Sequence, residues 1–122
     1  MKETGSNLTT LTCFKTYDVR GELGVNFDAN IAYRIGYAIA QHFESGNVII
    51  GHDARRTSPD IAQALARGIC DGGSRVLDIG MAGTEEMYWA VTEFNACAGI
   101  EITASHNPIN YNGLKIVKSR SQ

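Results

Sequence analysis

Several side chains that could do chemistry lie close together near the end of the chain, in the stretch EITASHNPINYNGLKIVK at residues 101–118. Ser105 offers a hydroxyl, His106 an imidazole and Lys115 an ammonium group. His106 is badly placed to act as a base for Ser105, because adjacent side chains of an extended segment point to opposite faces. The sequence also lacks a G-x-S-x-G elbow, so a hydrolase triad is a poor fit.

Three cationic side chains, Arg20, Arg55 and Lys115, could surround the Ser105 hydroxyl if the fold brings them together. Arg55 precedes an expected helix N-terminus, whose backbone N–H groups favour anions. A hydroxyl ringed by cations suits the stabilisation of a phosphoryl group better than that of an acyl intermediate. The chain has no Walker A, G-x-G-x-x-G or kinase signature, so the motifs do not indicate a bound nucleotide.

Each of these residues also has a purely structural interpretation. Ser105 could be a solvated turn serine, and His106 could brace the loop through hydrogen bonds. Lys115 alternates with apolar residues, so it could lie on the solvent side of an edge strand. Arg55 could be one of a solvated pair, and Arg20 an ion-paired turn residue.

The elements that must position these residues follow from the apolar spacing. Helices are expected over residues 28–43, from 58 to the glycine pair 72–73, and over 84–95, with Asp28, Ser58 and Thr84 as N-caps. Strands are expected over residues 47–53, 74–80, 98–104 and 113–117, the first two as buried strands. Asn112-Gly113 predicts a tight turn that would bring Lys115 back beside Ser105.

The alternation of strands and helices predicts an α/β domain with a mainly parallel sheet and right-handed crossovers. In such a sheet, ligands bind beyond the carboxyl ends of the strands. Three polar loops follow three of the expected strands, namely HDARRTS, GMAGTEE and SHNPINYNG. We therefore expect these loops to form one site at a single edge of the sheet.

Length and composition indicate one ordinary globular domain spanning residues 1–122. Of its 122 residues, 43% are hydrophobic and 20% charged, and the net charge is only −2. Composition gives no reason to expect nucleic acid or a membrane as a partner, and the first residues lack a secretory apolar region. A cytoplasmic location is expected by default. The three cysteines, Cys13, Cys70 and Cys97, are expected to be reduced core residues.

Three motifs resemble the N-terminal domain signatures of the α-D-phosphohexomutases. They are FKTYDVRG at residues 14–21, GHDARRTSP at 51–59 and ITASHNPINYNGLKIV at 102–117. A fourth, GMAGTEEMY at 80–88, looks most similar to bacterial phosphomannomutases that feed GDP-mannose synthesis. The resemblance covers nearly the whole chain from Leu11 onward and implies a three-layer α/β/α domain with a mostly parallel mixed sheet.

The resemblance implies roles for individual residues. Ser105 matches the serine that carries the phosphoryl group, which it donates to a hexose phosphate through a bisphosphorylated sugar intermediate. Arg20 and Lys115 match positive residues around the phosphoserine, with Lys115 a candidate to assist proton transfer. His106 and Asn107 match loop residues beside the serine. Tyr17 matches a residue at the cleft, and Arg55 an arginine that could bind substrate phosphate.

The implied cofactors are Mg²⁺, contacted by Ser105 through its phosphate, and hexose 1,6-bisphosphate as activator. Members of the family have four domains, so the main metal ligands and the sugar-selecting loop are expected in later domains of the same enzyme. The implied activity is interconversion of mannose 6-phosphate and mannose 1-phosphate. Two alternatives remain: a phosphoglucomutase domain, or a truncated, non-catalytic module that binds phosphosugars or a partner. Phosphoglucosamine mutase fits less well, because its opening motif usually reads more like FGTDGIRG.

Overall fold

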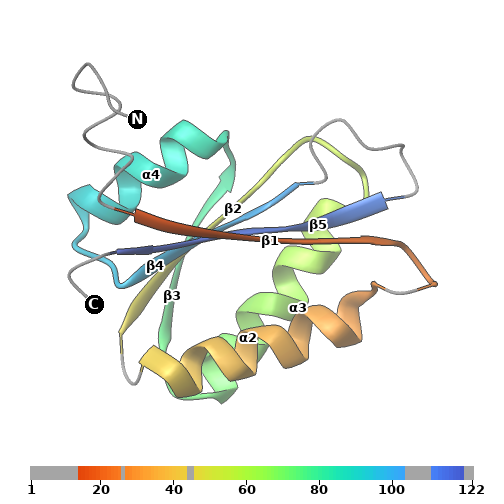
Figure 1. Cartoon of the computed structure of the whole chain (residues 1–122), viewed down its shortest axis with the longest axis horizontal. Helices are drawn as coiled ribbons and strands as arrows, with labels where there is room; N and C mark the ends of the chain where they lie inside the picture. The colour runs from red at the N-terminus through yellow and green to blue at the C-terminus, as the bar shows by residue number, and fades with distance from the viewer. Residues whose placement is uncertain (1–13, 26, 44–45, 104–110, 120–122) are drawn as a thin grey trace.

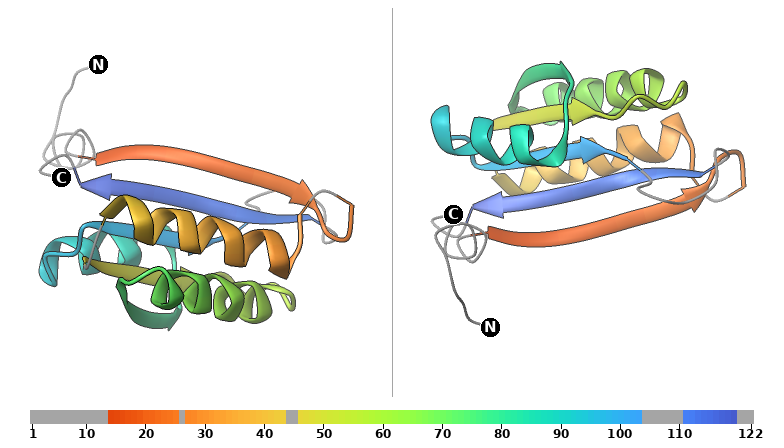
Figure 2. Two further views of the ribbon diagram at one scale, coloured as in Figure 1. Left: turned by 90° about the horizontal axis from the view of Figure 1, so that it is seen from below. Right: turned by 90° about the horizontal axis from the view of Figure 1, so that it is seen from above.

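The structure is a computed structural model that describes residues 14–25, 27–43, 46–103 and 111–119. Its strands are β1 (Phe14–Glu22), β2 (Asn47–His52), β3 (Arg75–Met81), β4 (Ala98–Ile102) and β5 (Tyr111–Ser119). Its helices are α2 (Ala29–Phe43), α3 (Ser58–Asp71) and α4 (Thr84–Glu93). Helices α2 and α3 cover one face of the sheet and α4 the other (Figures 1 and 2), which confirms the expected three-layer α/β/α arrangement.

The sheet is mixed and has the strand order β1-β5-β4-β2-β3. Strand β2 pairs in parallel with both β3 and β4, while β5 runs antiparallel to β4 and to β1. The first strand, β1, was not among the expected strands, and it contains Arg20, for which a turn position was one interpretation. Because β1 occupies the edge, β5 is an interior strand, so the interpretation of Lys115 as an edge-strand residue is wrong.

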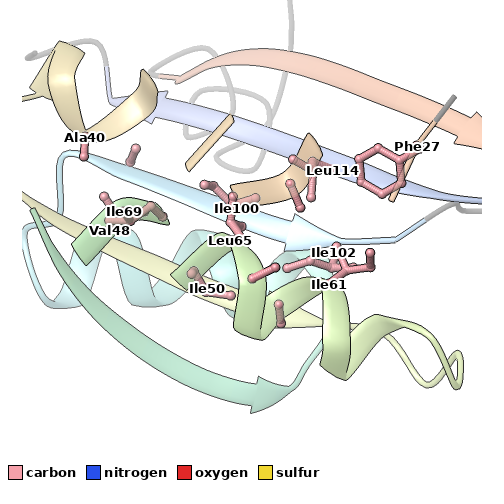
Figure 3. Packing of buried hydrophobic residues seen from close by; sticks show 14 of the residues in the cluster. Phe27, Ala40, Val48, Ile50, Ile61, Leu65, Ile69, Ile100, Ile102 and Leu114 are labelled. Atoms are coloured by element: carbon pink, nitrogen blue, oxygen red, sulfur yellow. The ribbon is translucent and has the colours of Figure 1, made fainter. Parts of the chain in front are cut away.

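The larger hydrophobic core lies between the sheet and the helices α2 and α3. It contains Ile50, Leu65, Ile100 and Leu114, all fully buried (Figure 3). Helices α2 and α3 approach closely because glycines face the partner helix. A Cβ atom added to Gly68 would lie 2.1 Å from the carbonyl oxygen of Tyr33 on α2.

The helix starts agree with the sequence interpretation at one place and shift by one residue at two others. Asp28 caps α2, where its side chain accepts a hydrogen bond from the backbone N–H of Ile31 at 2.9 Å. The N-cap of α3 is Thr57 and not Ser58, and that of α4 is Gly83 and not Thr84. Ser58 is the first residue of α3, and its hydroxyl donates to Asp53 instead of capping the helix.

Two predictions about burial are wrong. None of the residues of β3 is fully buried, because β3 is an edge strand and α4 packs over β2 and β4. Cys70 is exposed on α3, whereas Cys97 is buried as expected. Cys13 lies outside the described residues.

Candidate active site

The carboxyl ends of β2, β3 and β4, and the loops that follow β2 and β3, meet at one end of the sheet as expected, whereas most of the third polar loop lies outside the described residues. The backbone N–H of Asp53, directly after β2, donates to the carbonyl oxygen of Ile102 at the end of β4, at 3.0 Å. The N–H of Ala82, after β3, donates to the carbonyl oxygen of His52, also at 3.0 Å. The ends of β2, β3 and β4 are therefore held side by side.

Asp53 organises the loop between β2 and α3. Its Oδ1 accepts hydrogen bonds from the Ser58 hydroxyl at 2.6 Å and from the backbone N–H of Arg55 at 3.0 Å. Its other carboxylate oxygen lies 3.7 Å from Nε of Arg55, whose side chain is 14% exposed. These contacts fix the turn that leads into α3.

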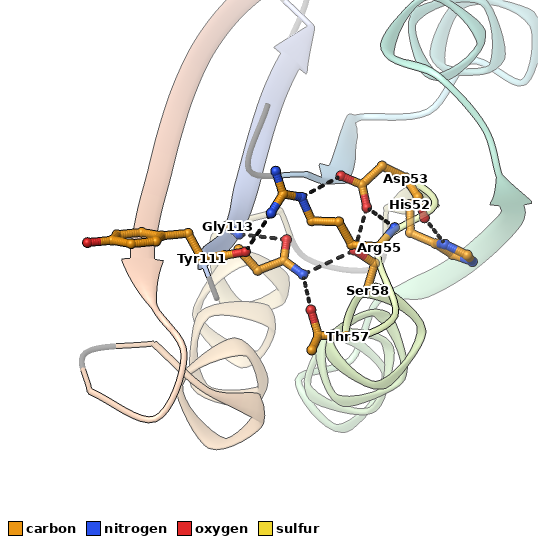
Figure 4. Close-up of polar contacts among 8 residues, drawn as sticks. His52, Asp53, Arg55, Thr57, Ser58, Tyr111 and Gly113 are labelled. Carbon is orange, nitrogen blue, oxygen red and sulfur yellow. Dashed lines mark hydrogen bonds and ion pairs between the residues drawn. The ribbon is translucent and has the colours of Figure 1, made fainter. Parts of the chain in front are cut away.

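This loop also holds the start of β5, the strand that follows the Ser105 segment (Figure 4). Arg55 donates from Nη1 to the carbonyl oxygen of Tyr111 at 3.3 Å. The buried Asn112 donates from Nδ2 to the hydroxyl oxygens of Thr57 and Ser58, at 2.8 and 3.1 Å. The β2–α3 loop and the first two residues of β5 thus form one hydrogen-bonded unit.

The predicted tight turn at Asn112-Gly113 is wrong. Both residues lie within β5, and the described glycines with positive φ are Gly24, Gly73 and Gly80. Asn112 bonds to Thr57 and Ser58 and, through Oδ1, accepts from the N–H of Gly113 at 2.9 Å. The carbonyl oxygen of Gly113 accepts from the N–H of Thr103 at 3.0 Å. Sheet pairing, and not a turn, therefore brings β5 alongside the end of β4.

The structure places Lys115 in a row that crosses the sheet. Asp18 on β1 pairs with Lys115 on β5, Lys115 pairs with Glu101 on β4, and Glu101 pairs with Gly51 on β2. Directly paired residues share a face of the sheet. This is the α4 face, because a Cβ atom on Gly99, two residues before Glu101, would meet Met87 and Val91 of α4.

The register separates two other predicted site residues. Arg20 pairs with Gly113, two residues from the Asp18–Lys115 pair, so Arg20 and Lys115 occupy positions on the same face. Tyr17 is 52% exposed and pairs with Ile116, which puts it on the opposite face from Lys115. Ser105, His106 and Asn107 lie outside the described residues.

Sequence reasoning missed the buried Glu101 and the structural role of Asn112. Glu101 is 1% exposed, and burial, together with the nearby carboxylates of Asp53 and Glu86, raises its pKa to about 8. The available signal was an acidic residue inside an otherwise apolar strand segment. The role of Asn112 was missed because the dipeptide Asn112-Gly113 is typical of turns.

The residues described do not by themselves make a metal centre. Within these parts of the chain, no group of three or more His, Cys, Asp or Glu side chains could hold a metal ion. The donor set that Mg²⁺ prefers, several oxygen ligands, is therefore not assembled by the described residues. No described helix is both long and apolar enough to cross a membrane.

Comparison with known proteins identifies the family. The family model for phosphoglucomutase/phosphomannomutase, alpha/beta/alpha domain I, matches residues 11–122. The chain belongs to this family. It is 51% identical over 115 residues to phosphomannomutases of Klebsiella pneumoniae and Escherichia coli. The match covers 94% of this chain in both cases, but 73% of the Klebsiella protein and only 25% of the E. coli protein.

Solved structures place the same domain in longer chains. A phosphoglucomutase/phosphomannomutase family protein from Burkholderia thailandensis is 33% identical, with a TM-score of 0.76. The likeness covers 87% of this chain and 26% of that one. A protein of Thermus thermophilus is 31% identical, with a TM-score of 0.77, and is covered over 24% of its length. This chain thus corresponds to about a quarter of these two structures.

Proposed function

We propose that the chain is the phosphoserine-bearing domain of a phosphomannomutase that interconverts mannose 6-phosphate and mannose 1-phosphate. The observation that carries the proposal is the 51% identity with phosphomannomutases over 94% of the chain, a match that includes the segment around Ser105. In the structure, the two strands that flank this segment are held together by the bond between Thr103 and Gly113. Domain I of a four-domain enzyme is the matching architecture, and hexose phosphates and the later domains are its partners.

In this proposal, phosphorylated Ser105 donates its phosphoryl group to a free hydroxyl of the hexose monophosphate. The bond between phosphorus and the serine oxygen breaks and a bond to the sugar oxygen forms. The sugar hydroxyl loses one proton and the serine oxygen takes one up, so that Ser105 is left as a free hydroxyl. The bisphosphorylated sugar then reorients and returns its other phosphoryl group to the serine. No net phosphate is consumed, so the reaction is an isomerisation.

The chain's own residues have defined parts in this scheme. Lys115 and Arg20 occupy positions on one face of the sheet and would stabilise negative charge on the transferring group. Lys115 would also assist proton transfer, and His106 and Asn107 would support the loop and the phosphate. Tyr17 and Arg55 are further candidates for substrate contact, although the contacts of Arg55 described above bind it to Asp53 and Tyr111.

Mg²⁺ and a hexose bisphosphate activator are proposed as cofactors because of the family resemblance. Mg²⁺ would offset the charge of the phosphoserine, and its remaining ligands would have to come from outside the described residues. A cytoplasmic location and a place in GDP-mannose synthesis are likewise proposed on the resemblance alone.

A domain exchange tests the proposal. Residues 1–122 would replace the matching quarter of the E. coli phosphomannomutase, and conversion of mannose 1-phosphate would be measured with hexose bisphosphate present. We expect mutase activity and a phosphoryl group on the peptide that contains Ser105. A folded chimaera that shows neither activity nor phosphorylation would contradict the proposal. Activity on glucose 1-phosphate alone would favour the phosphoglucomutase alternative.

A further inference from the structure

Glu101 is a fully buried acidic side chain that the proposed reaction does not use. It lies on β4, is 1% exposed, and its Oε1 has no hydrogen-bond partner among the described residues. A buried carboxylate oxygen without a partner makes the anion costly, because burial removes the water that would solvate its charge. The environment therefore favours the neutral acid.

The groups around Glu101 reinforce this preference. Asp53 at the end of β2 and Glu86 on α4 both act on it with negative charge. Lys115 on β5 is the cross-strand neighbour of Glu101, but it is not among the groups that shift the pKa of Glu101. From β3, the apolar Ile79 lies close to Gly51. Burial first, and then Asp53 and Glu86, raise the pKa of Glu101 to about 8.

The sheet is built to accommodate this side chain. Oε1 of Glu101 lies 2.7 Å from the position that a Cβ atom on Gly51 would occupy. A side chain at position 51 would force the Glu101 carboxyl group to move from this place. The neutral carboxyl thus fills the layer between β2, β4 and α4 instead of reaching solvent.

The position of Glu101 near the end of β4 connects the packing of its carboxyl group to the proposed site. Glu101 precedes Thr103 by two residues, and Thr103 is the last described residue before the Ser105 segment. The N–H of Asp53, one of the two acidic neighbours, also holds the end of β4 through the carbonyl oxygen of Ile102. A change in how Glu101 packs would therefore act on the strand end from which Ser105 follows.

We propose that Glu101 is a pH-sensitive positioning residue: its neutral carboxyl packs over Gly51 and holds β4 in place, and its ionisation weakens this hold. The consequence for Ser105 rests on the proposed function, whereas the effect on the fold does not. The sign follows from linkage. The pKa is about 8 in the folded protein and 4.5 for a free glutamate. Between these values only the folded state holds the proton, so stability falls as pH rises from 4.5 to about 8 and then levels off.

The test compares Glu101→Gln with the native 122-residue chain, using thermal unfolding from about pH 5 to about pH 9. Glutamine keeps the shape but cannot ionise. We expect the unfolding midpoint of the variant to rise relative to that of the native chain as pH increases. The difference should reach roughly several degrees at the alkaline end. Glu85→Gln, at an exposed position on α4, is the matched control and should follow the native curve. Parallel curves for all three proteins would overturn the proposal.

A direct titration keeps the proposal testable if Glu101→Gln fails to fold. The carboxyl carbon of Glu101 in the native chain would be followed by NMR, and its titration midpoint should lie well above the free-glutamate value of 4.5. A midpoint near the free-glutamate value of 4.5 would overturn the proposal. The same unfolding series would be repeated with Mg²⁺ present. If Mg²⁺ abolished the loss of stability at alkaline pH, Glu101 would be an ionised ligand of the cation, and the proposal would be overturned.

The chimaera supplies the functional readout. There, kcat of the native sequence should fall on the alkaline side relative to that of Glu101→Gln, with KM unchanged. Identical pH profiles would overturn the link to Ser105. An inactive chimaera would count against the proposed function, while the unfolding and NMR measurements would still decide the role of Glu101.

Discussion

The Arg55 guanidinium donates a hydrogen bond to the carbonyl oxygen of Tyr111 across 3.3 Å, joining the loop after β2 to the first residue of β5. Fifty-six positions separate the two residues along the chain. The position of the start of β5, which follows the Ser105 segment, therefore depends on a loop that comes much earlier in the sequence.

Replacing Arg55 with methionine should weaken this junction. The substitution keeps the aliphatic stem but removes the charge and the donors, in a side chain that is only 14% exposed. We expect a loss of about 1.5–3 kcal/mol in the free energy of unfolding, a typical value for one hydrogen bond to a charged group. Urea denaturation measures it, with the exposed Arg67→Met as control. Unchanged stability combined with a raised KM for the sugar phosphate in the chimaera would instead place Arg55 on the substrate.

Asn112→Ala should also destabilise the chain. The side chain is fully buried, donates to the hydroxyls of Thr57 and Ser58, and accepts from the N–H of Gly113. Its removal leaves buried polar groups without partners, which costs about 1–3 kcal/mol. Denaturant unfolding would show the loss, and a variant as stable as the native chain would refute the role of Asn112 as a clamp.

Ser105→Ala in the chimaera should abolish most mutase turnover, because no hydroxyl remains to carry the phosphoryl group. Steady-state conversion of mannose 1-phosphate measures turnover, and mass spectrometry of the segment's peptide measures phosphorylation. Near-normal turnover would remove Ser105 from the mechanism.

Lys115→Met should slow the transfer step by ~10²-fold or more, the usual size for one acid–base or charge-stabilising group. Single-turnover measurements isolate this step from binding and release. Lys118→Met, on the same strand, is the matched comparison. Equal rates for the native sequence and Lys115→Met would exclude Lys115 from the transfer.

Gly68→Ala should separate α2 from α3. The added Cβ would lie 2.1 Å from the carbonyl oxygen of Tyr33, and backbone cannot yield as a flexible side chain can. Overpacking of this kind costs typically about 1–3 kcal/mol, or more. Thermal unfolding would detect it, with the exposed Gln63→Ala on α3 as control. A Gly68→Ala variant as stable as the control would show that the helices do not pack through this glycine.

Local patterns in the sequence determined the helices, the central strands and the meeting of the carboxyl ends of β2, β3 and β4 at one end of the sheet. Helical spacing placed α2 and α3 within a residue of their bounds, and parallel pairing placed the ends of β2 and β4 together. These features depend on short-range periodicity and on the fixed direction of parallel strands, which a sequence displays directly. The motifs around Ser105 were equally local, and they led to the family.

Only the tertiary structure decided which strands are edges and which polar residues are buried. Strand β1 takes the edge beside β5, so Lys115 lies in the interior of the sheet, while β3 is left at the other edge. Asn112 looks like a turn residue beside Gly113, but its bond to Thr57 helps to hold it in a strand. Glu101 is buried because Gly51, on a neighbouring strand, leaves it room. Each outcome depends on partners far away along the chain, and such contacts leave no periodic trace in the sequence.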